Sequence, residues 1–228
     1  MPRHFPVSQE VSGLRLKRGL SASNFSLTNT TIHNCFIEAP KSLAHRSVVR
    51  DVTIRQCQHF ACSAIGAHFE NVTVEDIRGG GRAMSFLWGC VYSNVLLKGW
   101  IGGLLHRWML DPNDIPRSRE LLTDNVCFYN DIDLALDIAG ARFTFTQHLL
   151  GVPSRAVRRN PAWHYVLTEA SAKAILADST SDALWQSIAK DLVDVQLPDV
   201  VVVLGEGGSS AAKDRGIAEQ LRKSDILT

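Results

Sequence analysis

The sequence predicts a mainly β solenoid, and three observations support this fold class. A phrase of about six residues recurs along residues 24–130, at a spacing of roughly 20–25 residues that widens before the last copy. Apolar and polar side chains alternate with a period of two, as in β-strands. Each copy also carries an Asn or Asp that favours a turn. The five copies begin at Leu27, Val49, Phe69, Tyr92 and Thr123, and their turn residues are Asn29, Asp51, Asn71, Asn94 and Asn125.

The alternation assigns a side to each position of the phrase. The first and third residues after the Asn or Asp are mostly apolar, as in Val52 and Ile54, so we expect them to face the interior. The positions on the other side would form an outward column of alternating charge at Arg55, Glu75 and Lys98. Asn and Asp tolerate the left-handed turn conformation, and their side chains can hydrogen-bond from copy to copy.

On these phrases, the stretch resembles a right-handed parallel β-helix, the shape of pectate-lyase-like and pentapeptide-repeat proteins, whose coils can carry an asparagine ladder. The likeness covers a little under half of the chain and concerns the fold alone, because no catalytic motif of a particular family is matched. It implies a right-handed parallel β-helix of about five coils with a C-terminal α/β segment. The expected organisation is an N-terminal cap at 1–20, the β-helix at 21–150 with an insertion at 101–122, and a C-terminal α/β cap or small domain at 151–228.

The segments outside the phrases predict helices and one buried strand. Within the insertion, a Pro- and Asp-rich turn precedes a short helix at 117–122. Thr168 is suited to cap a helix, as is Ser181 or Asp182. The continuous apolar run after Asp199 is typical of a strand that is buried on both faces. The expected elements are helices at Glu169–Ala177, from Ser181 or Asp182 to Val193 and at Ala211–Lys223, and a strand at Val200–Leu204.

Composition sets limits on location and partners. The 228 residues are 45% hydrophobic and 21% charged, which is typical of a folded globular protein. A net charge of +1 creates no global field for nucleic acid, so we do not expect nucleic acid as a partner. Five cysteines without a disulfide framework favour reduced thiols and a cytoplasmic location. No secretory leader is visible, and the longest apolar run is too short for a membrane span.

Two stretches are candidate binding surfaces. Inserted loops often carry function, and the insertion holds His106, Arg107 and Trp108; it could equally be a lateral plug. The most basic stretch contains Arg158 and Arg159 beside aromatic residues, a combination that can hold phosphates. A linker between the solenoid and the C-terminal segment is the alternative interpretation of that stretch.

Two further motifs are weaker. Glycines and hydroxyls between a strand and a helix can cradle a phosphate, but a plain glycine-rich connection is the preferred interpretation. The chain ends without the second strand and acidic residue of a dinucleotide site, so no cofactor is predicted. Cys57, His59 and Cys62 are metal-ligand types. Cys57 stands three residues beyond Ile54, where we expect the chain to turn a corner and point inward again, so no metal site is predicted. The residues of the weak phosphate site are Gly205, Gly207, Gly208 and Ser209.

Function is left between two classes. A non-enzymatic protein-binding or scaffold protein is the first hypothesis, because no catalytic constellation is evident; its partner would be another protein. The alternative is a carbohydrate-active enzyme, a polysaccharide lyase or hydrolase using the outer β-helix groove, as the resemblance implies. Such an enzyme needs two carboxylates at a defined separation, although solvated loop carboxylates are the simpler interpretation. Its candidates would be Asp111, Asp114, Asp131 and Asp133, assisted by His106 or Arg107.

Overall fold

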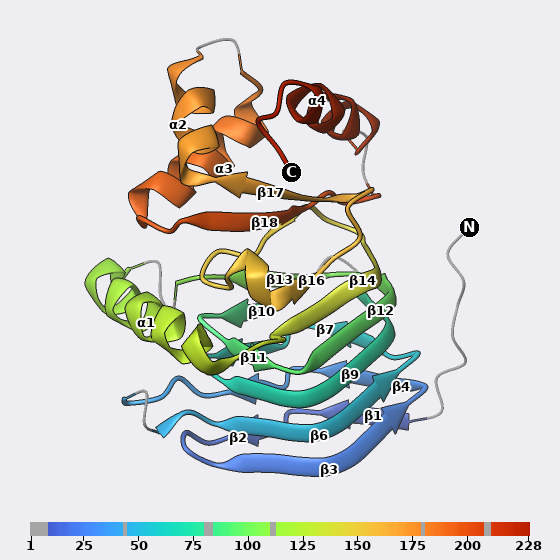
Figure 1. The fold of residues 1–228 in the computed structure, drawn as a ribbon. Helices are drawn as coiled ribbons and strands as arrows, with labels where there is room; N and C mark the ends of the chain where they lie inside the picture. The colour runs from blue at the N-terminus through green and yellow to red at the C-terminus, as the bar shows by residue number, and fades with distance from the viewer. Residues whose placement is uncertain (1–8, 43–44, 80–83, 110–112, 179–180, 208–210) are drawn as a thin grey trace.

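The computed structural model describes residues 9–42, 45–79, 84–109, 113–178, 181–207 and 211–228. Within these residues the chain forms two large parallel sheets, one small antiparallel sheet and four α-helices (Figure 1). The parallel sheets occupy the lower part of Figure 1, and the antiparallel sheet and three of the helices lie above them.

The ten-stranded parallel sheet has two limbs that meet at β9. In one limb the order is β1, β4, β7, β9; in the other, β3, β6, β9, β12, β14, β16, and β11 also pairs with β9. β9 is long enough to serve both limbs, because the part from His68 to Glu75 pairs with β6 and its last residues, Arg78 and Gly79, pair with β7. The bounds are β1 Gln9–Ser12, β3 Ser21–Thr28, β4 Thr30–His33, β6 Val48–Arg55, β7 Gln58–Phe60, β9 His68–Gly79, β11 Val91–Ser93, β12 Val95–Ile101, β14 Leu136–Phe143 and β16 Val157–Arg158.

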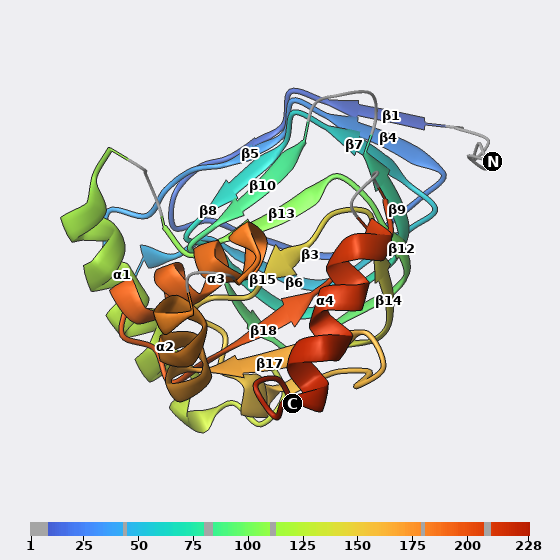
Figure 2. The ribbon, with the colours of Figure 1, turned by 90° about the horizontal axis from the view of Figure 1, so that it is seen from above.

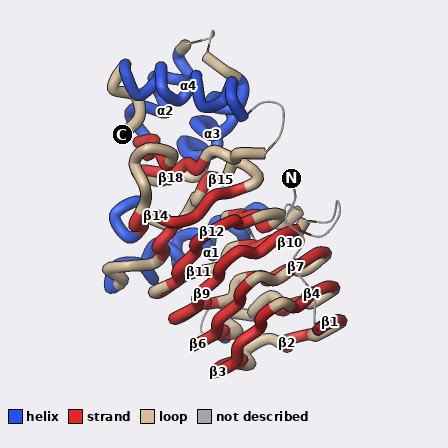
Figure 3. The backbone as a smooth tube through the Cα atoms, turned by 90° about the vertical axis from the view of Figure 1, so that its right-hand side faces the viewer, coloured by secondary structure: helices blue, strands red, loops and turns tan. Residues whose placement is uncertain are grey.

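The five-stranded parallel sheet forms a third wall, in the order β13, β10, β8, β5, β2. The antiparallel sheet has the order β15, β18, β17 and lies across one end of the parallel sheets (Figure 3). The bounds are β2 Arg15–Leu16, β5 Phe36–Ile37, β8 Ser63–Ile65, β10 Ser85–Trp88, β13 Leu104–Arg107, β15 Gln147–His148, β17 His164–Thr168 and β18 Asp199–Val203.

The helices begin where the chain supplies capping side chains. Asp114 caps α1, Thr168 caps α2 and Asp182 caps α3, each by accepting a hydrogen bond from a backbone N–H of the first turn. The predicted helices of the C-terminal region are confirmed, α2 and α4 at their predicted bounds. The bounds are α1 Ile115–Phe128, α2 Glu169–Ala177, α3 Ala183–Asp194 and α4 Ala211–Lys223, with short 3-10 turns η2 Tyr129–Asp131 and η3 Ser154–Ala156.

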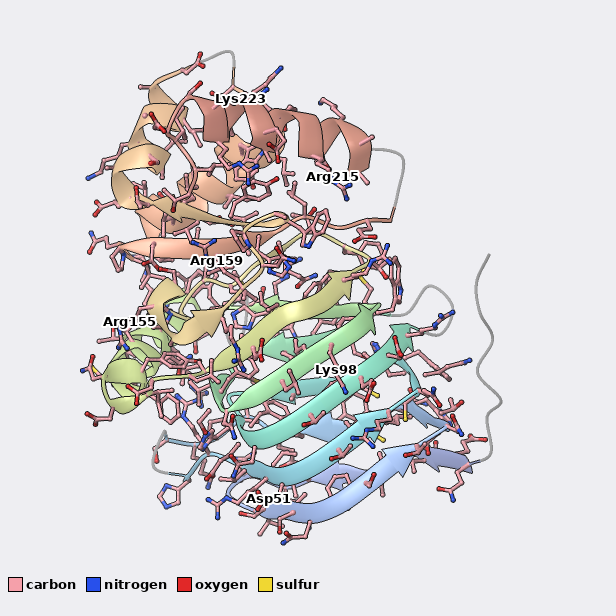
Figure 4. The ribbon with its side chains drawn as sticks, turned by 45° about the vertical axis from the view of Figure 1, so that its right-hand side comes forward. Asp51, Lys98, Arg155, Arg159, Arg215 and Lys223 are labelled. Atoms are coloured by element: carbon pink, nitrogen blue, oxygen red, sulfur yellow. The ribbon has the colours of Figure 1, made fainter. Side chains whose placement is uncertain are left out.

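The first four phrases lie in β3–β4, β6, β9 and β11–β12. Val52 lies opposite Val72, and both are buried as predicted. On the outer face Glu75 contacts Arg55 at 3.2 Å and Lys98 at 3.0 Å, which confirms the alternating charge column. Lys98 is visible on the outer face of β12 in Figure 4.

The predicted left-handed conformation of the Asn/Asp column is confirmed for these four phrases, and the predicted hydrogen bonding between copies is confirmed for the second to fourth. The backbone φ angle is 52° at Asn29, 53° at Asp51, 52° at Asn71 and 54° at Asn94, all in the left-handed region. Asn71 Nδ2 donates to Asp51 Oδ1 at 3.1 Å, and Asn94 Nδ2 donates to Asn71 Oδ1 at 2.9 Å. The side chains therefore form a short hydrogen-bonded ladder at the strand bends.

The expected fold class is wrong, however. The described strands are divided between a ten-stranded and a five-stranded sheet, and they are combined with an antiparallel sheet and four helices. This arrangement is a sheet-rich α/β domain rather than a right-handed parallel β-helix of about five coils. The fifth phrase, residues 123–128, is not a strand but the last part of α1.

The physical reason for the helix is visible in its burial pattern. Ser118, Leu121, Leu122 and Asn125 are the buried residues of α1, a helical spacing that the strand-like reading of residues 123–128 overlooked. Asn125 consequently takes no part in the asparagine ladder.

The antiparallel sheet joins two hydrophobic cores. Val201 and Val203 of β18 belong to the core enclosed by the parallel sheets. Val200 and Val202 pack instead with the helices, in a second core that includes Trp185. Figure 2 shows α2, α3 and α4 on the outer side of β17 and β18. β18 is therefore buried on both faces, which explains its continuous apolar sequence.

Candidate functional site

α1 begins within the predicted insertion and extends beyond it, and a partly buried arginine holds it against the sheets. Arg46 Nη1 donates to the carbonyl oxygens of Gly66 at 3.0 Å and Gly89 at 3.4 Å. Its Nη2 donates to Asn125 Oδ1, and Asn125 Nδ2 donates to Gly89 O at 3.2 Å. Burial lowers the pKa of Arg46, so the guanidinium is stabilised there by carbonyl and amide oxygens.

A surface groove of about 320 Å³ lies between α1 and the loop that follows β5. Arg117 Nη2 donates to Pro40 O at 2.9 Å and connects the helix to that loop. The lining combines two cations, two carboxylates and an apolar floor. The lining residues are Pro40, Lys41, Ser42, Arg117, Glu120, Leu121 and Asp124.

His106, predicted as a surface binding residue, is buried instead. Its Nε2 lies 3.0 Å from Leu150 O and must donate there, so its Nδ1 accepts the hydrogen bond from Tyr92 Oη at 3.0 Å. The backbone N–H of His106 donates to Gln147 Oε1 at 3.1 Å. Burial lowers the pKa of His106 to about 4, so the imidazole is neutral at pH 7.

An apolar cavity of about 170 Å³ lies inside the parallel sheets beside this network. Its polar lining atoms come from Tyr92, His106 and Gln147, which already bond to one another or to the backbone. The remaining lining is hydrophobic, including Phe69, Leu104 and many branched aliphatic side chains. The cavity therefore presents apolar surface and no charged group.

The other predicted binding residues lie apart and serve as connections. Trp108 is half-buried and packs against the second core, and Arg107 beside it is also half-buried. Arg158 forms an ion pair with Asp137. Arg159 donates to His164 O at 3.2 Å, and Figure 4 shows it between the parallel sheets and the C-terminal layer. The structure therefore does not join Arg158 and Arg159 with His106, Arg107 and Trp108 in one site.

The candidate acids also lie apart. Asp111 lies outside the described residues. Asp114 accepts from Arg117 N at 3.1 Å as the cap of α1, and the length of that 14-residue helix, about 20 Å, separates it from Asp131. That separation exceeds the roughly 5–10 Å between the carboxylates of glycosidases. Asp131 and Asp133 are exposed to solvent, unlike a general acid in a desolvated pocket.

The glycine-rich loop uses its amide groups within the chain. Gly205 N donates to Thr146 Oγ1 at 3.1 Å, and Gly207 N donates to Thr144 O at 3.0 Å. Glu206 N donates to Phe143 O, while its carboxylate pairs with Arg142. These amides are therefore not directed at an anion. Gly208 and Ser209 lie outside the described residues.

The structure pairs His59, which the sequence suggests only as a metal-ligand type, with Ser85, which the sequence does not suggest. His59 Nδ1 lies 2.7 Å from Ser85 Oγ, and His59 Nε2 lies 2.6 Å from Gly102 O. His59 and Ser85 are each 3% exposed, and Cys62 N also donates to Ser85 Oγ. The pair connects the two parallel sheets. Neither His59 nor Ser85 lies within a repeated phrase, so the alternation of the phrases gives no signal for this pair.

Within the described parts of the chain, no group of three or more His, Cys, Asp or Glu side chains is arranged to hold a metal ion. Cys57 is buried, and its thiol donates to the Arg55 and Leu27 carbonyl oxygens. None of the described helices is long and apolar enough to cross a bilayer.

The fold and these surfaces define a sheet-rich α/β protein with a hydrogen-bonded interior and a charged groove beside α1. Comparison of the chain with protein-family models, characterised proteins and solved structures yields no significant match.

Proposed function

We propose that this chain is a non-enzymatic binding or scaffold protein, and that the groove beside α1 receives a polypeptide segment of another protein. The observation that carries the proposal is the composition of the groove. Leu121 and Pro40 supply an apolar floor, flanked by charges of both signs. The fitting segment presents an apolar side chain between acidic and basic residues, because such a sequence complements both kinds of charge.

Size and charge favour a peptide over other ligands. A volume of about 320 Å³ suffices for a few side chains and is at the lower limit of small-molecule pockets. Glu120 and Asp124 oppose the phosphates of a nucleic acid. The lining residues include no aromatic ring for stacking on a sugar. All five cysteines are free thiols, which supports the cytoplasm as the compartment in which the partner is met.

Affinity isolation with a charge-reversed groove tests this function. Wild-type chain and a Glu120→Lys variant are used as baits, and co-purifying proteins are quantified by mass spectrometry. The expected result is a partner that is depleted at least tenfold with the variant, because facing like charges across an interface cost several kcal/mol and about 1.4 kcal/mol already corresponds to tenfold. The partner is then confirmed by titrating its purified segment.

Glu169→Lys is the matched control, since Glu169 lies on α2 and makes only an exposed ion pair with Lys173. This variant should retain the partner, and both variants should unfold near the wild-type temperature. If the same proteins are recovered with Glu120→Lys as with wild type, the groove is not the binding surface and the proposal fails.

A further inference from the structure

At the lower end of the molecule in Figure 1, the strands β1, β2 and β3 are the outermost strands of the three walls, which are the two limbs of the ten-stranded sheet and the five-stranded sheet. β1 and β3 each end a limb of the ten-stranded sheet, and β2 ends the five-stranded sheet. An outermost strand pairs on one side only, so its other side presents N–H and C=O groups that can pair with another strand. Residues 9–20, expected as part of a cap, supply two of these edges themselves.

The longest edge, β3, lacks the charged and prolyl residues that commonly block pairing, although it bends at Asn24, where φ is 58°. Its eight residues, Ser21–Thr28, include no charged residue and no proline, whereas edge strands of monomeric proteins are commonly blocked by Lys or Pro. Apolar side chains are exposed at the same end. Leu14 is 62%, Leu20 is 52% and Phe25 is 40% exposed. Burial of such side chains would stabilise a contact.

The sequence of this end fits a second copy of itself. A two-fold axis through the middle of β3 makes β3 antiparallel to its symmetry mate and places Ser23 opposite Ser26, with no charges facing each other. The same rotation exchanges the other two walls, so β1 meets β2 of the second copy. Glu10 of β1 then lies near Arg15 and Arg18 of the second copy. Within one chain Glu10 pairs with His33 and both arginines pair with Glu38, but all three side chains remain at least 48% exposed.

We propose that two copies of this chain associate end to end through these edges, with β3 pairing to β3 and β1 to β2. The contact is separate from the groove beside α1 and goes beyond the proposed binding function. A second copy is the occupant favoured by the charges, because acidic and basic edges meet only when the two ends are related by the two-fold axis.

Sedimentation of the full chain over a range of concentrations tests the proposal. Wild type is compared with two double variants that place like or opposite charges on β3. Wild type should sediment at twice the mass of one chain. The double variant Ser23→Lys, Ser26→Lys should be monomeric, because antiparallel pairing sets the new lysines opposite each other. The double variant Ser23→Lys, Ser26→Glu should recover the dimer, because each new charge then faces its opposite. Ser23 and Ser26 are both exposed, so the fold tolerates the changes, which circular dichroism verifies.

Ala174→Lys with Gln220→Lys adds the same charge to exposed positions at the opposite end and should remain dimeric. Glu120→Lys should also remain dimeric, which separates this test from that of the groove. A monomeric wild-type chain overturns the proposal, even if it captures another protein through β3. A dimer that persists with both lysines, or a lysine–glutamate variant that stays monomeric, overturns it too.

Discussion

His106, His148 and His164 lie in surroundings that hold the pKa of each imidazole at about 4, compared with about 6.5 in an unfolded chain. Burial is the main cause in each case, and nearby Arg107 and Arg159 add to it at His148 and His164. The neutral form is therefore built into the folded state. His106 uses both ring nitrogens in this form, so protonation would remove the acceptor to which the Tyr92 hydroxyl donates.

These histidines predict a loss of stability in mild acid. Below pH 6.5 the unfolded chain takes up protons that the folded chain does not, so the free energy of unfolding falls until about pH 4. Each histidine contributes a slope of about 1.4 kcal/mol per pH unit, or about 2 kcal/mol by pH 5. Urea denaturation between pH 7 and pH 5 measures this decrease.

A variant without the imidazole provides the control for that slope. His106→Gln removes one titrating group, so it should reduce the pH slope by about 1.4 kcal/mol per unit, whatever its effect on stability at pH 7. An unchanged slope in this variant would show that His106 titrates equally in the folded and unfolded chain.

At the scale of elements, α1 depends on Arg46 for its position. The guanidinium connects α1, through Asn125, to the loops at Gly66 and Gly89. Arg46→Met keeps the apolar stem but loses these bonds, and it leaves oxygen atoms without a donor. We expect a loss of about 3 kcal/mol, because hydrogen bonds to a charged group contribute about 1.5–3 kcal/mol each and are partly replaced by water.

Hydrogen exchange distinguishes a local effect from a general one. In Arg46→Met, the amides of α1 should exchange faster than those of β9 and β12 relative to wild type. Arg50→Met is the matched control, since Arg50 makes an exposed ion pair with Glu70 and such pairs contribute about 0–1 kcal/mol. Equal acceleration in α1 and the sheets would argue against a specific role of Arg46 in holding the helix.

The same elements show how far the sequence could predict this structure. Strand alternation, the left-handed Asn positions and the capped helices are local properties, and these were predicted correctly. The prediction of a strand at the fifth phrase was wrong. Asn125 fits the repeated sequence pattern, but its burial together with Leu121 and Leu122 follows the helical period. The number of sheets and their arrangement depend on pairing between strands that are far apart in the sequence, and no single phrase determines that pairing.

The candidate site was less predictable for a related reason. The groove joins Pro40 and Lys41 to Arg117 and Glu120, which are far apart in sequence. Arg46 likewise reaches Asn125 across 79 positions. His106 was assigned to the surface because it lies in an insertion, yet β13 places it inside. Burial of a polar residue in a short strand has little local signature.

At the scale of the whole molecule, β18 makes the two cores interdependent. Val201 packs in the core enclosed by the parallel sheets, and Val202 packs in the second core, with the helices. Both side chains are fully buried. We therefore expect one cooperative unfolding transition. Val201→Ala and Val202→Ala should each lower its midpoint, at a cost of about 2 kcal/mol or more. Scanning calorimetry measures both variants. Two separable transitions, each shifted by one variant alone, would contradict the coupling.

The two ends of the parallel sheets are unlike, and this difference limits the size of any assembly. The upper end is covered by β15, β17 and β18, whereas the lower end presents β1, β2 and β3. Growth into a filament requires two complementary surfaces on every subunit. A chain with one self-associating end can bind only one other copy through it. Once two copies are joined, neither has a free end for a third. If the proposed dimer forms, a higher concentration should increase the fraction of dimer without producing longer assemblies.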